Sequence, residues 1–197
     1  LRANQGRVLA DGKAYLTNAR IVNADVREMS ARELSGNAQV DLVVGGPPCQ
    51  SFSSSGKQLS VLDPRGRLLQ EFIRLIDEIK PRMFMFENVR GLVTARDANG
   101  EPGGVIHDLL GRFQDLGFSC RTALLNAADY GAPQRRVRCF VIGSRRGTAP
   151  AFPEPTHQKA ADIFHRPWLS LRSFLEQHAD PNSDAYSRPT ADLAREP

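Results

Sequence analysis

Cysteine is scarce in this chain, and its three cysteines are not spaced as a metal-binding or redox pair. Cys49, Cys120 and Cys139 form no C-x-x-C motif and suggest no disulfide framework, which is typical of a reducing, cytoplasmic setting. Cys120 and Cys139 lie within apolar runs, where a buried core cysteine is the ordinary outcome. Histidine also lacks metal-like spacing to cysteine or carboxylate, so we predict no metal site.

No apolar stretch of the sequence is long enough to cross a bilayer, and residues 1–6 lack the pattern of a signal peptide. The sequence also contains no G-x-G-x-x-G and no Walker motif. The 197 residues are 41% hydrophobic and 24% charged, which is typical of a globular protein of about one domain. A formal net charge of +4 suits a polyanionic partner without requiring one.

Short apolar runs alternate with amphipathic segments in most of the chain. Helical spacing predicts helices at 68–79 and 105–116, with a cap at Asp63-Pro64 before the first and Gly117 closing the second. The predicted strands are 15–22, 40–44, 83–86, 120–125 and 137–142, with a hairpin as one option for the last two. This alternation predicts an α/β fold with a mostly parallel sheet and helices on both faces.

The amino-acid composition changes near residue 143, after which prolines become frequent. We expect a domain over residues 1–147 and an extended appendage over 148–197, with one short helix at 169–177. Gly143 is predicted to be a turn at this boundary. The polar, serine-rich loop 51–62 is a candidate for a segment that closes over a substrate.

Cys49 stands apart from the other cysteines because it follows a predicted strand. Pro47-Pro48 stiffens the turn before it, and Gln50-Ser51 makes its surroundings polar. A thiol at the carboxyl end of a strand is well placed for a nucleophile, provided that a nearby positive charge or helix N-terminus favours the thiolate. The alternative is another buried cysteine.

Glu87 lies in the same context, directly after the apolar run 83–86 and before Asn88. Because the carboxyl ends of parallel strands share one edge of a sheet, Cys49 and Glu87 are expected to form a two-part active site, with Asp25 at the same edge. Taken alone, Glu87 is equally compatible with an ordinary surface residue.

A basic segment, Gln134-Arg135-Arg136-Val137-Arg138, opens the last predicted strand. Strand alternation places Gln134, Arg136 and Arg138 on one face. Adjacent arginines suit a phosphate or the carbonyl oxygen of a base. The alternative is a solvated basic patch.

Three motifs occur in a fixed order: Pro47-Pro48-Cys49-Gln50, Glu87-Asn88-Val89 and Gln134-x-Arg136-x-Arg138. Together they resemble the DNA cytosine-5 methyltransferases, and the similarity extends over most of residues 1–175. The resemblance implies a Rossmann-like S-adenosylmethionine-dependent methyltransferase fold and double-stranded DNA as the partner. It also implies a bacterial restriction-modification or orphan enzyme, cytoplasmic and associated with the nucleoid through DNA.

The same resemblance implies a mechanism for these residues. A cytosine is flipped out of the duplex, and the Cys49 thiolate adds to its C6. Glu87 holds N3 and the exocyclic amine, Arg138 binds O2, and Arg136 braces Glu87. A methyl group passes from S-adenosylmethionine to C5.

The resemblance also assigns supporting residues. Asp25 is expected to contact the cofactor adenine, with Gly46 and Pro48 lining the wall shared by cofactor and base. Asn88 is expected to hold the segment around Glu87. The other residues expected to support the substrate are Gln50, Ser51 and Gln134.

Two parts of the family pattern are missing from this sequence: the opening Phe-x-Gly-x-Gly cofactor turn and the closing segments. The fold is therefore expected to be incomplete at both ends. A fragment is favoured over a split-enzyme subunit completed by a second chain, and over a degenerate relative. We expect this chain alone to transfer methyl groups poorly.

Two other functions are compatible with parts of the sequence. One is a catalytically silent DNA-binding or interaction module with the same fold. The other is an unrelated cysteine hydrolase, and the lack of a histidine at a strand end disfavours the hydrolase.

Overall fold

The structure is a computed structural model that describes residues 5–6, 8, 14, 16–36, 38–48, 67–97 and 99–178. Three predicted site residues, Cys49, Gln50 and Ser51, lie outside the described residues, as do the loop 51–62 and the helix cap at Asp63-Pro64.

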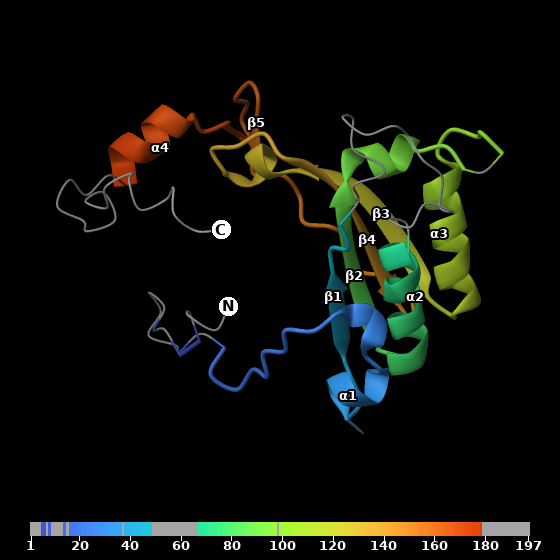
Figure 1. Ribbon diagram of the computed structural model, residues 1–197. Helices are drawn as coiled ribbons and strands as arrows, with labels where there is room; N and C mark the ends of the chain where they lie inside the picture. The colour runs from blue at the N-terminus through green and yellow to red at the C-terminus, as the bar shows by residue number, and fades with distance from the viewer. Residues whose placement is uncertain are drawn as a thin grey trace, which may run out of the picture.

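Four strands form the main sheet, in the order β1-β2-β4-β3 (Figure 1). Their bounds are β1 Leu42–Gly45, β2 Met83–Val89, β3 Ser119–Asn126 and β4 Val137–Ser144. β1 and β2 are parallel, whereas β4 runs antiparallel to both β2 and β3. The α/β fold is as predicted, but the described part of the sheet is mixed. The reason is the short connection between β3 and β4, which forms a hairpin and forces the antiparallel pairing.

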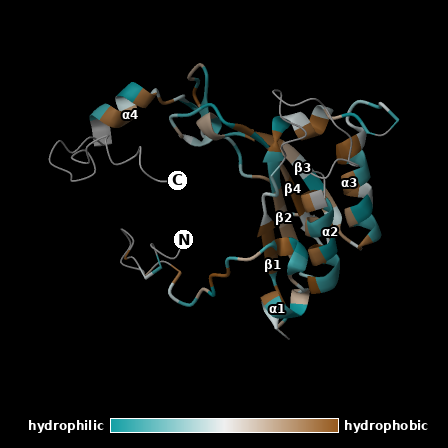
Figure 2. Cartoon of the chain, viewed as in Figure 1, coloured by the Kyte–Doolittle hydropathy of each residue, from teal (hydrophilic) through white to brown (hydrophobic). Residues whose placement is uncertain are grey.

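Helices α2 (Arg67–Ile79) and α3 (Gly104–Asp115) lie on one face of this sheet (Figure 1). Both match the helices predicted from apolar spacing. The prediction placed helices on both faces, but in the part that the structure describes the other face is open, with Leu42 51% and Val44 57% exposed. Figure 2 shows strongly hydrophobic strands beside helices of mixed character.

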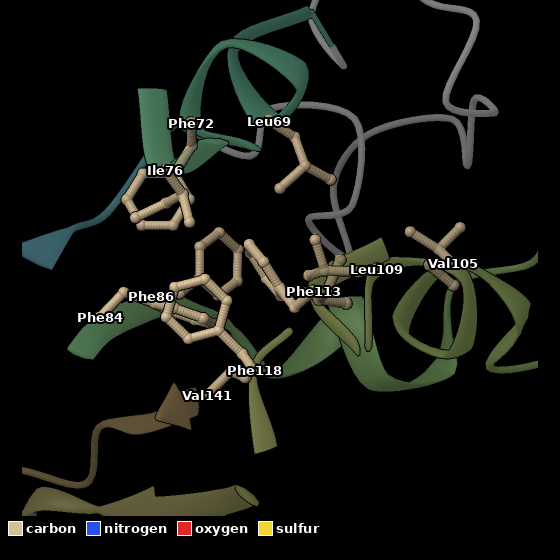
Figure 3. Packing of buried hydrophobic residues seen from close by; sticks show 12 residues of the cluster. Leu69, Phe72, Ile76, Phe84, Phe86, Val105, Leu109, Phe113, Phe118 and Val141 are labelled. Carbon is tan, nitrogen blue, oxygen red and sulfur yellow. The ribbon is translucent and has the colours of Figure 1, made fainter. Parts of the chain in front are cut away.

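Aromatic rings fill the space between the sheet and the two helices (Figure 3). The Phe84 ring lies 4.2 Å from the Phe113 ring and 4.9 Å from the Phe118 ring, measured between centroids. The Phe72 ring of α2 lies 5.5 Å from the Phe86 ring of β2. These contacts fix β2, and with it Glu87, relative to both helices.

The segment around Asp25 is tied to α2 through one arginine. Arg74 forms ion pairs with Glu71 and Glu78 and also donates to the backbone carbonyls of Val26 and Met29.

The predicted strand 15–22 is absent from residues 16–22, which are turn and irregular backbone.

The short helices η2 (Val26–Glu28) and α1 (Ala31–Ser35) follow this segment. A capping box starts α1: the Ser30 side chain accepts from the Glu33 backbone, and the Glu33 carboxylate accepts from Ser30.

Gly143 lies within β4, where it pairs with Phe84, and the prediction of a turn there was wrong. A Cβ at this position would lie 2.1 Å from the Phe84 ring. The glycine therefore serves close packing in a strand and not chain reversal.

The remaining elements are two short helices between elements of the core and a segment that follows β4. They are η3 (Arg90–Thr94), η4 (Ala127–Tyr130), the two-stranded pair β5 (His157–Gln158) and β6 (Arg166–Pro167), and α4 (Leu171–His178), close to the helix predicted at 169–177. Among the described residues, no helix is long and apolar enough to cross a membrane.

Candidate active site

Glu87 and Arg138 form an ion pair across β2 and β4. Arg138 Nε lies 3.1 Å from Glu87 Oε1, and the Arg138 and Glu87 side chains are 24% and 33% exposed. Glu87 lies within β2 and pairs with Phe140, so the strand continues beyond its predicted end at residue 86. A partly desolvated carboxylate beside a guanidinium is held in one orientation by charge and hydrogen bonding.

The turn that leads toward Cys49 lies directly against this pair. A Cβ at Gly46 would stand 3.1 Å from Glu87 Oε2, a tight contact that the glycine avoids. Asn88 is 4% exposed; its Nδ2 donates to the Pro47 carbonyl at 3.2 Å, and its Oδ1 accepts from the Val89 backbone at 2.7 Å. The structure thus brings the Pro47-Pro48 and Glu87-Asn88 motifs together at the carboxyl ends of β1 and β2.

A cavity of about 290 Å³ opens beside Glu87. Its charged and polar lining residues are Glu87, Arg136, Arg138 and Tyr130, and its apolar lining residues are Leu125, Ala127, Phe140 and Pro153. The Tyr130 hydroxyl donates to the Pro153 carbonyl at 3.0 Å, which joins two parts of the wall. A few polar groups converging in an otherwise apolar cavity are typical of a small-molecule or base-binding site.

The two arginines differ in their roles in the structure. Arg138 forms the ion pair with Glu87. The family resemblance had instead implied that Arg136 would brace Glu87. Arg136 precedes β4, and its backbone N–H donates to Asn126 Oδ1 at 3.1 Å. Gln134 is exposed before the same strand, so the strand alternation assumed for residues 134–138 begins only at Val137.

A second cavity, of about 330 Å³, lies on the α2 side of β1. Gly46, Pro47 and Pro48 line it together with Phe72 and Leu68 of α2, and Val26 and Leu34 complete one side. Gly46 therefore lines this second cavity and lies beside Glu87, which lines the first.

Asp25 was expected to contact a cofactor, and it directly precedes Val26, which lines the second cavity. Its carboxylate accepts from the Arg27 backbone at 2.9 Å and from the Arg27 side chain. These hydrogen bonds hold the pKa of Asp25 at about 2, so the group is a carboxylate at neutral pH.

The two described cysteines match the buried role predicted for them. Cys139 is fully buried and Cys120 is partly buried, and burial raises the pKa of each thiol to about 11. Both are protonated at neutral pH and are poor nucleophiles. Cys49 directly follows Pro48, the last described residue of the turn.

Several residues of the site were not identified from the sequence. Tyr130 and Pro153 line the Glu87 cavity, and Asp129 beside Tyr130 accepts a hydrogen bond from Trp168 Nε1 at 2.8 Å. This hydrogen bond attaches Trp168 to η4, a long-range contact for which the sequence offers no local signal.

Comparison with known proteins supports the family suggested by the motifs. The family model of the C-5 cytosine-specific DNA methylases matches residues 12–191. The type II methyltransferase M.AquIA of Picosynechococcus is 40% identical over 127 residues, covering 60% of this chain and 49% of the relative. M.FnuDI of Fusobacterium nucleatum is 36% identical over 144 residues, covering 72% of this chain and 40% of the relative.

Solved structures share the fold. The methyltransferase EhMeth of Entamoeba histolytica superposes with a TM-score of 0.55 at 16% identity, over 73% of this chain and 44% of its own. A mutant of Spodoptera frugiperda DNMT2 has a TM-score of 0.50 at 21% identity, over 74% and 42%. The chain spans about half or less of the length of these relatives. With the family model matching most of its length, the chain belongs to the C-5 cytosine-specific DNA methylase family.

Proposed function

We propose that this chain carries the base-binding part of a DNA (cytosine-5-)-methyltransferase active site and acts on double-stranded DNA. The observation that supports this most is the Glu87–Arg138 pair in a cavity that borders the turn leading to Cys49. The charged groups around this cavity match the polar edge of a cytosine, which offers a ring nitrogen, an amine and a carbonyl oxygen.

In the proposed reaction a cytosine leaves the duplex and enters the 290 Å³ cavity. Glu87 holds N3 and the exocyclic amine, and Arg138 provides positive charge beside Glu87 and toward O2. The Cys49 thiolate forms a bond to C6, which places electron density on C5. After methylation at C5, loss of the C5 proton drives elimination of Cys49 and restores the ring.

The second cavity fits part of the expected cofactor. Val26, Pro48 and Leu68 give apolar surfaces suited to a flat adenine ring. Asp25 directly precedes Val26, and its carboxylate, although it accepts from Arg27, retains lone pairs that could accept from an exocyclic amine. S-adenosylmethionine bound there would supply an electrophilic methyl group. Because Gly46 lines the second cavity and lies beside Glu87 of the first, the donor and the base would approach each other near this residue.

Covalent trapping tests this function. A duplex containing 5-fluorocytosine, incubated with the protein and S-adenosylmethionine, is expected to form a stable adduct, because fluorine at C5 cannot leave as a proton does. Denaturing electrophoresis would reveal the adduct, and mass spectrometry would place it on Cys49.

The Cys49→Ser variant is expected to form no adduct, whereas Cys120→Ser is expected to form it normally. Cys120 is the matched control because its thiol, with a pKa of about 11, is inert at neutral pH. No adduct from the native protein at saturating S-adenosylmethionine would contradict the proposal and favour a silent DNA-binding module. An adduct that persists in Cys49→Ser would remove Cys49 from the mechanism.

We further expect the isolated chain to bind S-adenosylmethionine weakly. The family's Phe-x-Gly-x-Gly turn does not occur in the sequence, and in the described residues β1 pairs with β2 alone. Isothermal titration measures the affinity directly. Tight binding by this chain alone would show that its own residues complete the cofactor site.

A further inference from the structure

The loop between β5 and β6 displays two large apolar side chains to solvent. Ile163 is 90% exposed and Phe164 is 82% exposed, more than any other described large hydrophobic residue. They lie at a tip formed by Asp162-Ile163-Phe164-His165, hereafter the 162–165 tip. Adjacent exposed apolar residues in a folded protein commonly mark a contact surface.

The 162–165 tip is closed by hydrogen bonds to one carboxylate. Asp162 Oδ1 accepts from the backbone N–H groups of Phe164 at 2.8 Å and His165 at 2.6 Å, and lies 3.0 Å from His165 Nδ1. The Asp162 N–H donates to the His165 carbonyl at 3.2 Å. The backbone that carries Ile163 and Phe164 is therefore already ordered, which lowers the entropy lost when a partner binds.

Backbone and side-chain hydrogen bonds join this loop to the wall of the Glu87 cavity. The Arg166 N–H donates to the Thr156 carbonyl, and the Thr156 N–H donates to the Asp129 carbonyl at 2.9 Å. Trp168 Nε1 donates to the Asp129 carboxylate at 2.8 Å. Asp129 precedes Tyr130, which lines the cavity. In Figure 1 the loop after β5 rises at the end of the molecule where β1 and β2 end.

Two cationic residues flank the tip in the sequence, and a third lies against Trp168, which follows the tip. Lys159 and Arg166 are exposed on the two sides of the loop, and the Arg135 guanidinium lies 5.4 Å from the centre of the Trp168 ring. The Asp162 carboxylate is engaged by His165 and the backbone. Apolar side chains flanked by cations fit a ligand that offers phosphates and stacked bases together, which is a nucleic-acid duplex.

We propose that the 162–165 tip is a DNA-contacting wedge, with Phe164 packing against bases and Lys159 and Arg166 against the phosphates. The proposal rests on the proposed function, because a duplex that gives up one cytosine to the cavity has lost stacking nearby. Apolar side chains inserted at base steps stabilise such deformed DNA. The hydrogen-bonded connection through Asp129 keeps the wedge at a fixed position relative to the cavity.

Binding of a short fluorescent duplex to the full chain tests the wedge, with anisotropy measured over a range of salt concentrations. Phe164→Ala is expected to weaken binding at least about five-fold, in the range of a lost base-stacking contact. The slope of log Kd against log salt should stay unchanged, because no phosphate contact is lost. Lys159→Ala should reduce that slope by about one.

Leu42→Ala is the matched control, since Leu42 is a 51% exposed apolar residue at the amino end of β1. This variant should bind the duplex as the native chain does. Photocrosslinking from Phe164→p-benzoylphenylalanine should yield a protein–DNA product.

If the Phe164→Ala variant binds the duplex with native affinity, the proposed role of the tip is wrong. The proposed function would still stand in that case, provided that covalent trapping at Cys49 is unimpaired. A crosslink to a second copy of the chain in place of DNA would also overturn the wedge and make the tip a protein interface. No duplex binding by the native chain would overturn both the wedge and DNA as the substrate of this chain.

Discussion

Replacing Glu87 by glutamine is expected to slow covalent addition to 5-fluorocytosine DNA by about 10²–10⁴-fold, the usual range for a positioned acid or base. Glu87 is the only carboxylate among the described residues that line the 290 Å³ cavity. An amide keeps the size of the side chain but loses the negative charge that pairs with Arg138. Single-turnover adduct formation, followed by denaturing electrophoresis, measures the loss.

Glu101→Gln provides the matched control, because Glu101 is exposed and outside the cavity. This variant should react at the native rate. Arg138→Ala should also be slow, and combining it with Glu87→Gln should cost less than the sum of the two effects because the residues act as a pair. A Glu87→Gln variant that reacts at the native rate would remove Glu87 from the chemistry.

Local patterns predicted the elements that carry the site but not their ends. The apolar runs 40–44 and 83–86 correspond to β1 and β2, and helical spacing gave α2. The predicted end of β2 was too early because pairing with β4 extends the strand through Val89. Glu87 therefore lies inside the sheet, a position that depends on a partner strand about fifty residues later.

Other features depend on contacts that a local pattern does not encode. A glycine near a run of prolines is typical of a turn, yet Gly143 lies within β4. A glycine is needed there because the Phe84 ring occupies the space that a side chain would fill. The wall of the Glu87 cavity includes Tyr130 and Pro153, which meet through one hydrogen bond. In contrast, the start of α1 does have a local signal, the capping box at Ser30 and Glu33, although no helix was predicted there.

Truncating Phe84 to alanine is expected to cost about 3–5 kcal/mol of unfolding free energy. Phe84 is fully buried, and its ring packs against Phe113, Phe118 and Phe72 between the sheet and the helices. Alanine would leave a cavity at the centre of this cluster, where rings from different elements cannot easily close it. Urea unfolding followed by circular dichroism measures the loss.

Gly143→Ala should destabilise the native chain by about 1–3 kcal/mol, because the new methyl group would lie 2.1 Å from the Phe84 ring. In the Phe84→Ala background the same substitution should cost much less, since the ring it meets is gone. Gly111→Ala is the control: Gly111 lies in α3, and an added Cβ would have no atom within 4 Å, so alanine should stabilise the helix by about 0.5–1 kcal/mol. An equal cost of Gly143→Ala in both backgrounds would show that the glycine is needed for its backbone and not for the approach of Phe84.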